Sequence, residues 1–170
     1  VTSSQLLGRY NFYNIAAALC VAKYFKVDEQ SANEAIQNYQ PSNNRSQIIT
    51  QGSNIILLDA YNANLESIKG AIQALNVMPT THRVLILGDM AELGKETEEA
   101  HRALGRFTTR AVYKAVLLCG PHMMAAQETN SSALHFLNKE DLGVYLAQQK
   151  FSNTAFLIKG SRFLQLETLV

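Results

Sequence analysis

The sequence feature that most constrains this chain is a repeated pattern, in which a hydrophobic run is followed by a short polar string. The hydrophobic runs are residues 54–58 (NIILL), 84–87 (VLIL) and 155–158 (AFLI). The polar strings that follow are residues 59–64 (DAYNAN), 88–94 (GDMAELG) and 159–162 (KGSR). Continuous apolar runs of this length are typical of buried parallel strands. Because open α/β sheets bind ligands at the carboxyl ends of their strands, the pattern predicts a site where the three strings meet.

The rest of the second part of the chain alternates in the same way. Alternating β and α segments predict an α/β fold, a Rossmann-like, mostly parallel sheet with helices on both faces. We expect strands near residues 46–50, 54–58, 83–87, 115–119, 133–136 and 154–158, and helices near 64–76, 97–109, 122–127, 139–149 and 162–169.

The first part of the chain differs, because its pattern is helical only. Apolar and alanine residues recur at helical spacing over residues 11–25, and a second helix is predicted from Ser31, as N-cap, to about Tyr39. Turn-forming residues at 40–44 predict a domain boundary. We therefore expect residues 1–43 to be the helical remnant of another domain, and residues 44–170 to form the α/β domain. Because the sequence starts at Val1 without Met, we also expect a piece of a longer protein.

Composition excludes several classes of protein. Of the 170 residues, 47% are hydrophobic and 17% are charged, which predicts a globular core and not a disordered chain. A net charge of +1 provides no basic field for binding nucleic acid. No apolar run approaches the roughly 20 residues that span a bilayer, so we expect no membrane insertion. Cys20 and Cys119 are isolated thiols in apolar surroundings, which predicts core residues of a reduced, cytoplasmic protein.

The sequence lacks the common motifs that bind phosphate groups or zinc. Residues 88–95 resemble a Walker A loop, but five residues separate the glycines and Glu96 follows the lysine where Ser or Thr is required. There is no GxGxxG string. Cys119, His122, Met123 and Met124 fit no zinc-binding spacing.

Asp59 directly follows the first strand, where a carboxylate commonly binds the hydroxyls of a ribose. A helix-capping Asp is the other interpretation. Asn62 and Asn64 favour the binding site, because three polar side chains supply more donors and acceptors than one cap needs.

The other two strings each leave alternatives open. Asp89 and Glu92, with His101 on the next helix, form either a functional loop or a capped turn. Lys159 and Arg162 lie beside a predicted helix start, which favours an anion site over a solvated cationic turn.

Three further residues are candidates outside these strings. Asn11 and Asn14 share one helix face, and N-capping explains only the first of them. Arg45 lies in the predicted linker, from which its guanidinium group could reach a phosphate, although most linker arginines do not.

Together these strings resemble the Mur ligase family. The matching segments keep the family's order: residues 8–14 (GRYNFYN), 44–47 (NRSQ), 59–64, 88–94 with His101, and 159–162. The resemblance implies a protein with a UDP-sugar domain, a central ATPase domain and a Rossmann-like C-terminal domain. Residues 1–43 would end the central domain, and residues 44–170 would be the C-terminal domain.

What the resemblance implies for function is an ATP-dependent amide ligase of the bacterial cytoplasm, acting in peptidoglycan precursor synthesis. Its reaction would add D-alanyl-D-alanine to UDP-N-acetylmuramoyl-tripeptide with ATP and Mg²⁺. The family's P-loop, its metal-binding Glu and a His are not in this chain, so we predict that the chain holds no metal, has no catalytic residue and is inactive alone. The resemblance assigns Asn11, Asn14, Arg45, Asp59 and Asn62 to ATP, and Asn64, Asp89, Lys159, Ser161 and Arg162 to the substrates.

Two departures from the family pattern are present. Tyr10 stands where the family has His, which could alter a contact near the base. Leu65 replaces a Pro, which should loosen the start of the following helix.

Two other interpretations stay open. The chain could be a stand-alone Rossmann-like nucleotide-binding module, or an unrelated small α/β enzyme whose site is built from Asp89, Glu92 and His101.

Overall fold

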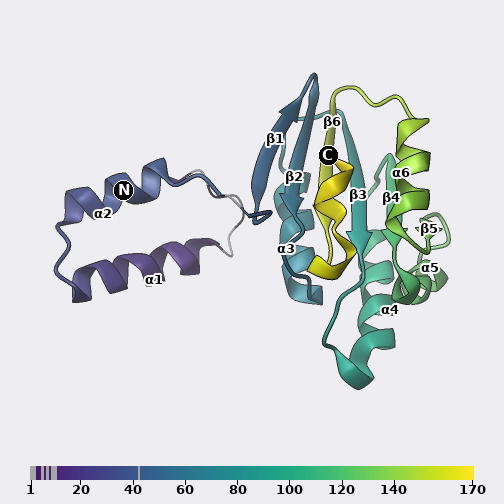
Figure 1. The fold of residues 1–170 in the computed structure, drawn as a ribbon, viewed down its shortest axis with the longest axis horizontal. Helices are drawn as coiled ribbons and strands as arrows, with labels where there is room; N and C mark the ends of the chain where they lie inside the picture. The colour runs from purple at the N-terminus through teal and green to yellow at the C-terminus, as the bar shows by residue number, and fades with distance from the viewer. Residues whose placement is uncertain (1–2, 5, 7, 9–10, 42) are drawn as a thin grey trace.

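A computed structural model describes residues 3–4, 6, 8, 11–41 and 43–170. Two helices, α1 (Asn11–Tyr24) and α2 (Glu29–Asn38), come first (Figure 1). Six strands follow: β1 (Gln47–Gln51), β2 (Asn54–Asp59), β3 (His82–Gly88), β4 (Ala115–Cys119), β5 (Leu134–Phe136) and β6 (Thr154–Lys159). Between them lie α3 (Leu65–Asn76), α4 (Thr97–Thr108), α5 (Met124–Thr129) and α6 (Lys139–Ala147). Short 3-10 turns occur at η1 (Gly94–Glu96), η2 (Pro121–Met123), η3 (Arg162–Leu164) and η4 (Leu166–Leu169).

The six strands form one sheet in the order β1-β2-β6-β3-β4-β5. All neighbouring strands are parallel except β1, which pairs antiparallel with β2. In this order β6 lies between β2 and β3, and Lys159 is in register with Asp59 on one side and Leu87 on the other. The predicted Rossmann-like, mostly parallel sheet is therefore confirmed.

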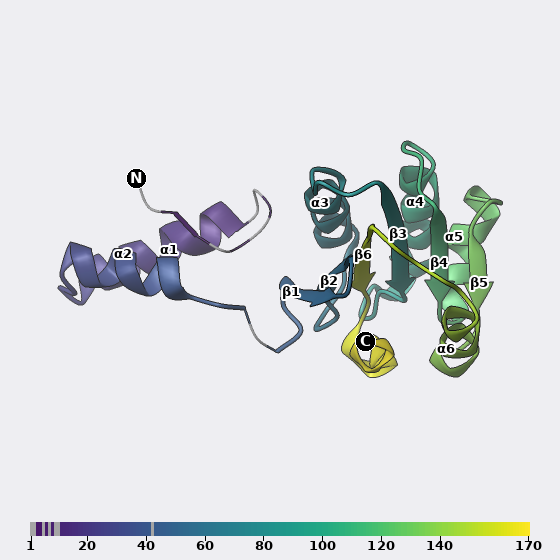
Figure 2. The ribbon, with the colours of Figure 1, turned by 90° about the horizontal axis from the view of Figure 1, so that it is seen from above.

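Helices cover both faces of the sheet, as predicted (Figure 2). The helices α3, α4 and α5 pack on one face, where buried residues such as Ile68, Leu75 and Leu104 meet Leu57 and Leu85 of the strands. The other face is covered by α6 and the C-terminal turns. It contains a second buried cluster, which includes Leu58, Ile86, Leu142, Ile158 and Leu166.

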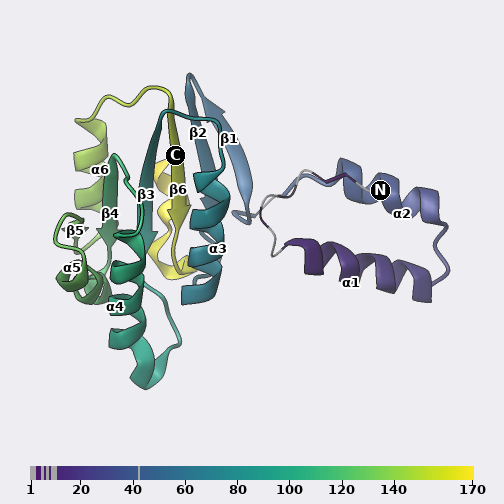
Figure 3. The same cartoon turned by 180° about the vertical axis from the view of Figure 1, so that it is seen from behind.

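The helices α1 and α2 lie beside the β1 edge of the sheet (Figures 1 and 3). Most of their large apolar side chains are exposed, among them Phe12 and Tyr24 on α1 at 67% and 80%. Two predictions about this segment are wrong. The N-cap of α2 is Asp28, whose side chain accepts from the Ser31 N–H, so Ser31 lies inside the helix. Cys20 is exposed and not a core residue, whereas Cys119 is buried, and burial raises the pKa of its thiol to about 11.

The prediction of a single helix over residues 162–169 is also wrong. The chain forms η3 and η4 there, separated by Gln165 in a left-handed conformation with φ of 50°. Consequently no α-helix N-terminus follows β6, and the helix dipole that was expected beside Lys159 and Arg162 is absent from this part of the described chain.

Candidate functional site

The three polar strings do meet at one edge of the sheet, because β2, β6 and β3 are adjacent and parallel. The first and third strings are joined by Lys159, whose ammonium Nζ lies 2.7 Å from Oδ2 of Asp59. The second and third are joined at Ser161, whose Oγ accepts from the Ala91 N–H at 2.8 Å and whose N–H donates to the Asp89 carbonyl at 3.0 Å. Hydrogen bonds thus connect all three strings.

Between this edge and the helices α1 and α2 lies a cavity of about 610 Å³. Its walls combine apolar side chains of the two helices with polar side chains of the linker and the β2 loop. The five residues predicted to bind the nucleotide all line it, although they come from three separate stretches of the chain. The lining includes Asn11, Asn14, Ile15, Ala18, Ile36, Tyr39, Arg45, Ser46, Asp59, Tyr61, Asn62, Ser67 and Lys159.

On the α1 side of the cavity, Asn14 donates from Nδ2 to Oδ1 of Asn11 at 2.9 Å. Asn11 is buried, with 6% of its surface exposed. This bond fixes the two amides relative to each other, as their spacing on one helix face predicted. Tyr10 lies outside the described residues.

Asp59 is the polar centre of the sheet side. Its Oδ1 accepts from the Ser46 N–H at 3.0 Å, and its Oδ2 accepts from Lys159. Both carboxylate oxygens have further lone pairs available for a ligand hydroxyl. Lys159 was predicted to offer its positive charge to an anion. The structure corrects this prediction, because Asp59 already neutralises the charge of Lys159.

Tyr61 is a residue that sequence reasoning did not assign. The guanidinium carbon of Arg45 lies 3.7 Å from the centre of its ring, and that of Arg162 lies 5.3 Å from it. Hydrogen bonding with the Arg45 side chain, followed by the positive charges of Arg45 and Arg162, lowers the pKa of the Tyr61 phenol below its usual value. Tyr61 therefore brings an arginine of the linker and an arginine of the β6 turn to one place. Its position inside the 59–64 string was the available signal.

Asn64, predicted to contact substrate, is the N-cap of α3. Its Oδ1 accepts from the Ser67 N–H at 2.8 Å, and the Ser67 hydroxyl returns a bond to the Asn64 backbone, which completes a capping box. It is not among the residues that line the cavity. The capping box also explains why the helix begins at Leu65 without the family's Pro, so the expected loosening of this helix start is not seen. Both asparagines are exposed, but Asn62 differs from Asn64 in that it lines the cavity.

Asp89 and His101 are both fully buried. Asp89 accepts from the N–H groups of His122 and Met123 at 3.3 and 3.0 Å, so it holds the turn after β4. The Met90 N–H donates to Nε2 of His101, and Nδ1 of His101 lies 2.6 Å from the Thr97 carbonyl. This arrangement fits a neutral imidazole protonated on Nδ1, although Nε2 also lies 3.9 Å from Asp89.

Burial is the main cause of the pKa shifts of this pair. It lowers the pKa of His101 and raises the pKa of Asp89. A substrate cannot reach either group in this structure, so the predicted substrate contact of Asp89 is not supported. The alternative small enzyme built from Asp89, Glu92 and His101 loses its basis for the same reason. Ser161 is likewise buried, at 3% exposure, and its hydroxyl is used by the second string.

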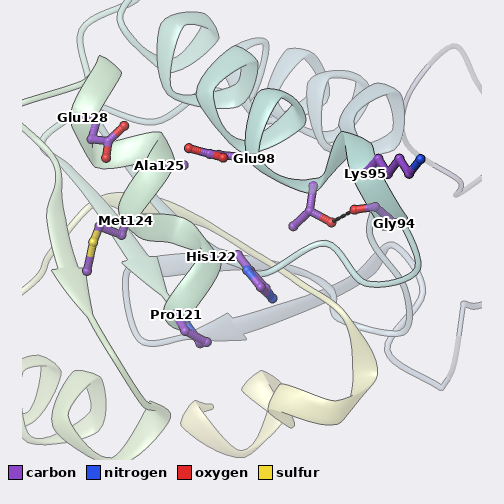
Figure 4. A pocket seen from close by; sticks show the side chains of 9 residues that line it. Gly94, Lys95, Glu98, Pro121, His122, Met124, Ala125 and Glu128 are labelled. Carbon is purple, nitrogen blue, oxygen red and sulfur yellow. Dashed lines mark hydrogen bonds between the residues drawn. The ribbon is translucent and has the colours of Figure 1, made fainter.

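A second pocket, of about 480 Å³, lies beside α4 and η2 (Figure 4). None of the predicted site residues lines it. Its charged side chains include Glu98 and Glu128, and Arg102 forms an ion pair with each of them. The two carboxylates at this pocket are thus already paired with Arg102 and need no charged ligand.

Two features are absent from the described residues, a metal-binding cluster and a membrane-spanning helix. No group of three or more His, Cys, Asp or Glu side chains gathers where it could hold a metal ion. No helix in the same residues combines the length and the apolar character needed to cross a membrane.

The family model for the Mur ligase glutamate ligase domain matches residues 44–162. The chain therefore belongs to the Mur ligase family.

Particular relatives within that family share a name. The UDP-N-acetylmuramoyl-tripeptide–D-alanyl-D-alanine ligase of Escherichia coli strain K12 is 33% identical over 97% of this chain, and that of Bacillus subtilis strain 168 is 28% identical over 97%. The matches cover 37% and 38% of those ligases. The chain thus spans little more than a third of the length of the relatives it matches.

Solved structures agree with the fold. A crystal structure of MurF from Acinetobacter baumannii has a TM-score of 0.86 and 27% identity, covering 95% of this chain and 37% of that one. A MurF ligase from Thermotoga maritima, solved in complex with ADP, has a TM-score of 0.81 at 24% identity, covering 96% of this chain and 38% of that one, which is a likeness of fold.

Proposed function

We propose that this chain is the C-terminal portion of an ATP-dependent ligase that adds D-alanyl-D-alanine to UDP-N-acetylmuramoyl-tripeptide in peptidoglycan precursor synthesis. The observation that carries the proposal is the 610 Å³ cavity, in which Asn11, Asn14, Arg45, Asp59 and Asn62 come together. The names of the ligases to which the chain is similar supply the reaction. In it, ATP phosphorylates the tripeptide carboxylate, and the dipeptide amine then displaces phosphate to form the amide.

The lining of the cavity fits a nucleotide. Apolar side chains such as Ile15 and Ile36 would pack against the base, and the amides of Asn11 and Asn14 would supply hydrogen bonds to its edge. Asp59 would accept from the ribose hydroxyls with its remaining lone pairs. Arg45, held on the Tyr61 ring, would contact the phosphates.

On the substrate side, Arg162 is the best supported of the predicted residues. It is exposed, and its guanidinium group lies on the same ring as Arg45. We propose that it orients an anionic group of the substrate, such as the activated carboxylate. Asp89 and Ser161 would act indirectly, by fixing the loop after β3, and Asn64 by fixing the start of α3.

We further propose that residues 1–43 are the helical end of a central ATPase domain. The support is the apolar surface of α1, where Phe12, Tyr13 and Tyr24 are exposed together. Such a surface is expected where a helix packs against a larger core.

Mg²⁺ and the phosphate-binding loop would be supplied by that central domain, as the resemblance to the Mur ligase family implies. We place the ligase in the bacterial cytoplasm, where nucleotide-linked cell-wall precursors are made.

The test uses the ligase that contains this chain. Purified enzyme with ATP and UDP-N-acetylmuramoyl-tripeptide should release phosphate only when D-alanyl-D-alanine is added. Asn14→Ala should raise the KM for ATP, because it removes an amide from the cavity. The matched control is Asn38→Ala, since Asn38 is an exposed residue of α2 that does not line the cavity.

Two results would contradict the proposal. Phosphate release that does not depend on the dipeptide would refute the reaction. An unchanged KM for ATP in Asn14→Ala would refute the nucleotide cavity.

A further inference from the structure

Lys159 is buried at the point where β2 and β6 end together. Its side chain is 3% exposed, although a lysine ammonium group is strongly hydrated in water. It was predicted to contact the substrate, yet it lines the same cavity as Asp59 and Asn62.

All of the ammonium group's hydrogen-bonding capacity is used inside the protein. An ammonium has three N–H donors and no acceptor. Nζ lies 2.7 Å from Oδ2 of Asp59, 2.9 Å from the carbonyl of Asn62 and 3.4 Å from the carbonyl of Asp59. A substrate anion could therefore bind Lys159 only by displacing one of these bonds.

All three partners belong to Asp59 at the end of β2 or to Asn62 in the loop that follows it. The bond to Oδ2 sets the rotation of the Asp59 carboxylate, whose other oxygen accepts from the Ser46 N–H at 3.0 Å. The bond to the Asn62 carbonyl sets the path of the loop on which Asn62 enters the cavity. Lys159 thus supports the cavity wall from within the sheet.

We infer that Lys159 is a positioning residue for the nucleotide, which acts through Asp59 and Asn62 and does not contact the dipeptide. The inference rests on the proposed function. It moves one residue of the KGSR string from the substrate side of the site to the nucleotide side.

The experiment is a comparison of KM values in the ligase that contains this chain. Lys159→Met removes the charge and keeps most of the side-chain length. We expect the KM for ATP to rise about tenfold or more, as when hydrogen bonds to a charged group are lost, with the KM for D-alanyl-D-alanine within about twofold of wild type. Lys150→Met is the control, because Lys150 is exposed and does not line the cavity.

A second variant covers the case in which Lys159→Met fails to fold, because it leaves Asp59 without its counter-charge. Asp59→Asn combined with Lys159→Met removes both charges of the pair together. In this double variant we again expect the KM for the dipeptide to stay within about twofold of wild type, since charges removed as a pair leave none unpaired.

The inference is overturned if either variant raises the KM for the dipeptide as much as, or more than, the KM for ATP. It is also overturned if Lys159→Met leaves the KM for ATP unchanged. Should the wild-type ligase not use the dipeptide at all, the proposed reaction fails. The inference is then tested by ATP binding alone, measured by calorimetry, which Lys159→Met must weaken and Lys150→Met must not.

Discussion

Asp59 is assigned two tasks in this structure, the proposed contact with ribose and the neutralisation of Lys159. The second could not be predicted from the sequence, because the two residues are 100 positions apart and their contact depends on β6 lying beside β2. It changes what a substitution of Asp59 should do. If Asp59 only contacted a ligand, its substitution would change the free energy of unfolding very little.

We predict that Asp59→Ala lowers the free energy of unfolding of the chain by about 3 kcal/mol or more, because it leaves a buried ammonium group without its partner. Chemical denaturation measures the effect. Asp59→Ala combined with Lys159→Met should recover most of the loss. Equal loss in the single and double variants would show that the ion pair is not the cause.

His101 makes folding dependent on pH. Burial lowers the pKa of its folded form, whereas the unfolded form keeps the usual value near 6.5. As pH falls below 6.5, the unfolded state binds a proton that the folded state refuses, so stability is lost by at most about 1.4 kcal/mol per pH unit. Asp89, whose Oδ1 lies 3.9 Å from Nε2 of His101, contributes to the pH dependence with the opposite sign. Its pKa is raised in the folded form, so the folded state binds a proton that the unfolded state does not. This contribution therefore adds stability as the pH falls through the raised pKa towards 3.8.

We therefore expect the free energy of unfolding to decrease as the pH is lowered from about 7 to about 5.5. We expect His101→Gln to reduce this pH dependence. Glutamine is neutral and can still accept from the Met90 N–H. Denaturation curves recorded at several pH values measure this dependence for the wild-type and the substituted chain. The prediction fails if the substituted chain shows the same slope as wild type.

At the scale of elements, α3 shows how a local signal can be assigned the wrong role. The sequence groups Asn64 with Asp59 and Asn62, because three polar side chains supply more donors and acceptors than one cap needs. The structure divides them, since Asn64 caps the helix and Asn62 lines the cavity. Nothing in the string itself tells which asparagine serves which purpose, because both depend on where the helix begins.

We predict that Asn64→Ala lowers the free energy of unfolding by about 1 kcal/mol, as for other lost caps, and leaves the KM for ATP of the ligase unchanged. Asn64→Asp should keep the stability, because Asp is an equally good cap. Thermal unfolding and steady-state kinetics provide the two measurements. A raised KM for ATP in Asn64→Ala would return this residue to the binding site.

The elements themselves were mostly predictable. Apolar runs such as 54–58 and 115–119 fixed strands to within a residue, because a strand buried on both faces needs such a run. The failure at 162–169 has a physical cause. Leu164 and Leu166 both approach Gly88, as their Cδ1 atoms would lie 2.5 and 2.8 Å from a Cβ added there. Residues two apart do not share a helix face, so packing against the sheet overrides the helical spacing.

At the scale of the whole molecule, the residues that line the cavity could be predicted only in part, since Tyr61 was not assigned, and their geometry could not be predicted at all. The sequence indicated that polar strings follow buried strands, which is enough to place them at one edge. It contained no information on strand order. Partners such as Asp59 and Lys159, or Ala91 and Ser161, follow only from β6 lying between β2 and β3.

We predict that the 170-residue chain alone has no ATP-dependent turnover and binds ATP with a dissociation constant on the order of 1 mM or weaker, equivalent to about −4 kcal/mol. The reason is that the triphosphate would be contacted here by Arg45 without a phosphate-binding loop. Calorimetry and a phosphate-release assay check both parts. A dissociation constant of about 0.1 mM or tighter, or turnover by the purified chain, would contradict the prediction.

The position of β6 has a consequence for how the molecule is made. In the observed strand order, the strands that precede residue 150 fall into two groups, β1–β2 and β3–β4–β5, which pair with each other only through β6. Strand β6 (Thr154–Lys159) joins these two groups, and it also carries the ammonium group that holds the loop after β2. The continuous sheet and the cavity wall formed by the loop after β2 can therefore form only once β6 has been synthesised, so a premature stop codon shortly before β6 should abolish both.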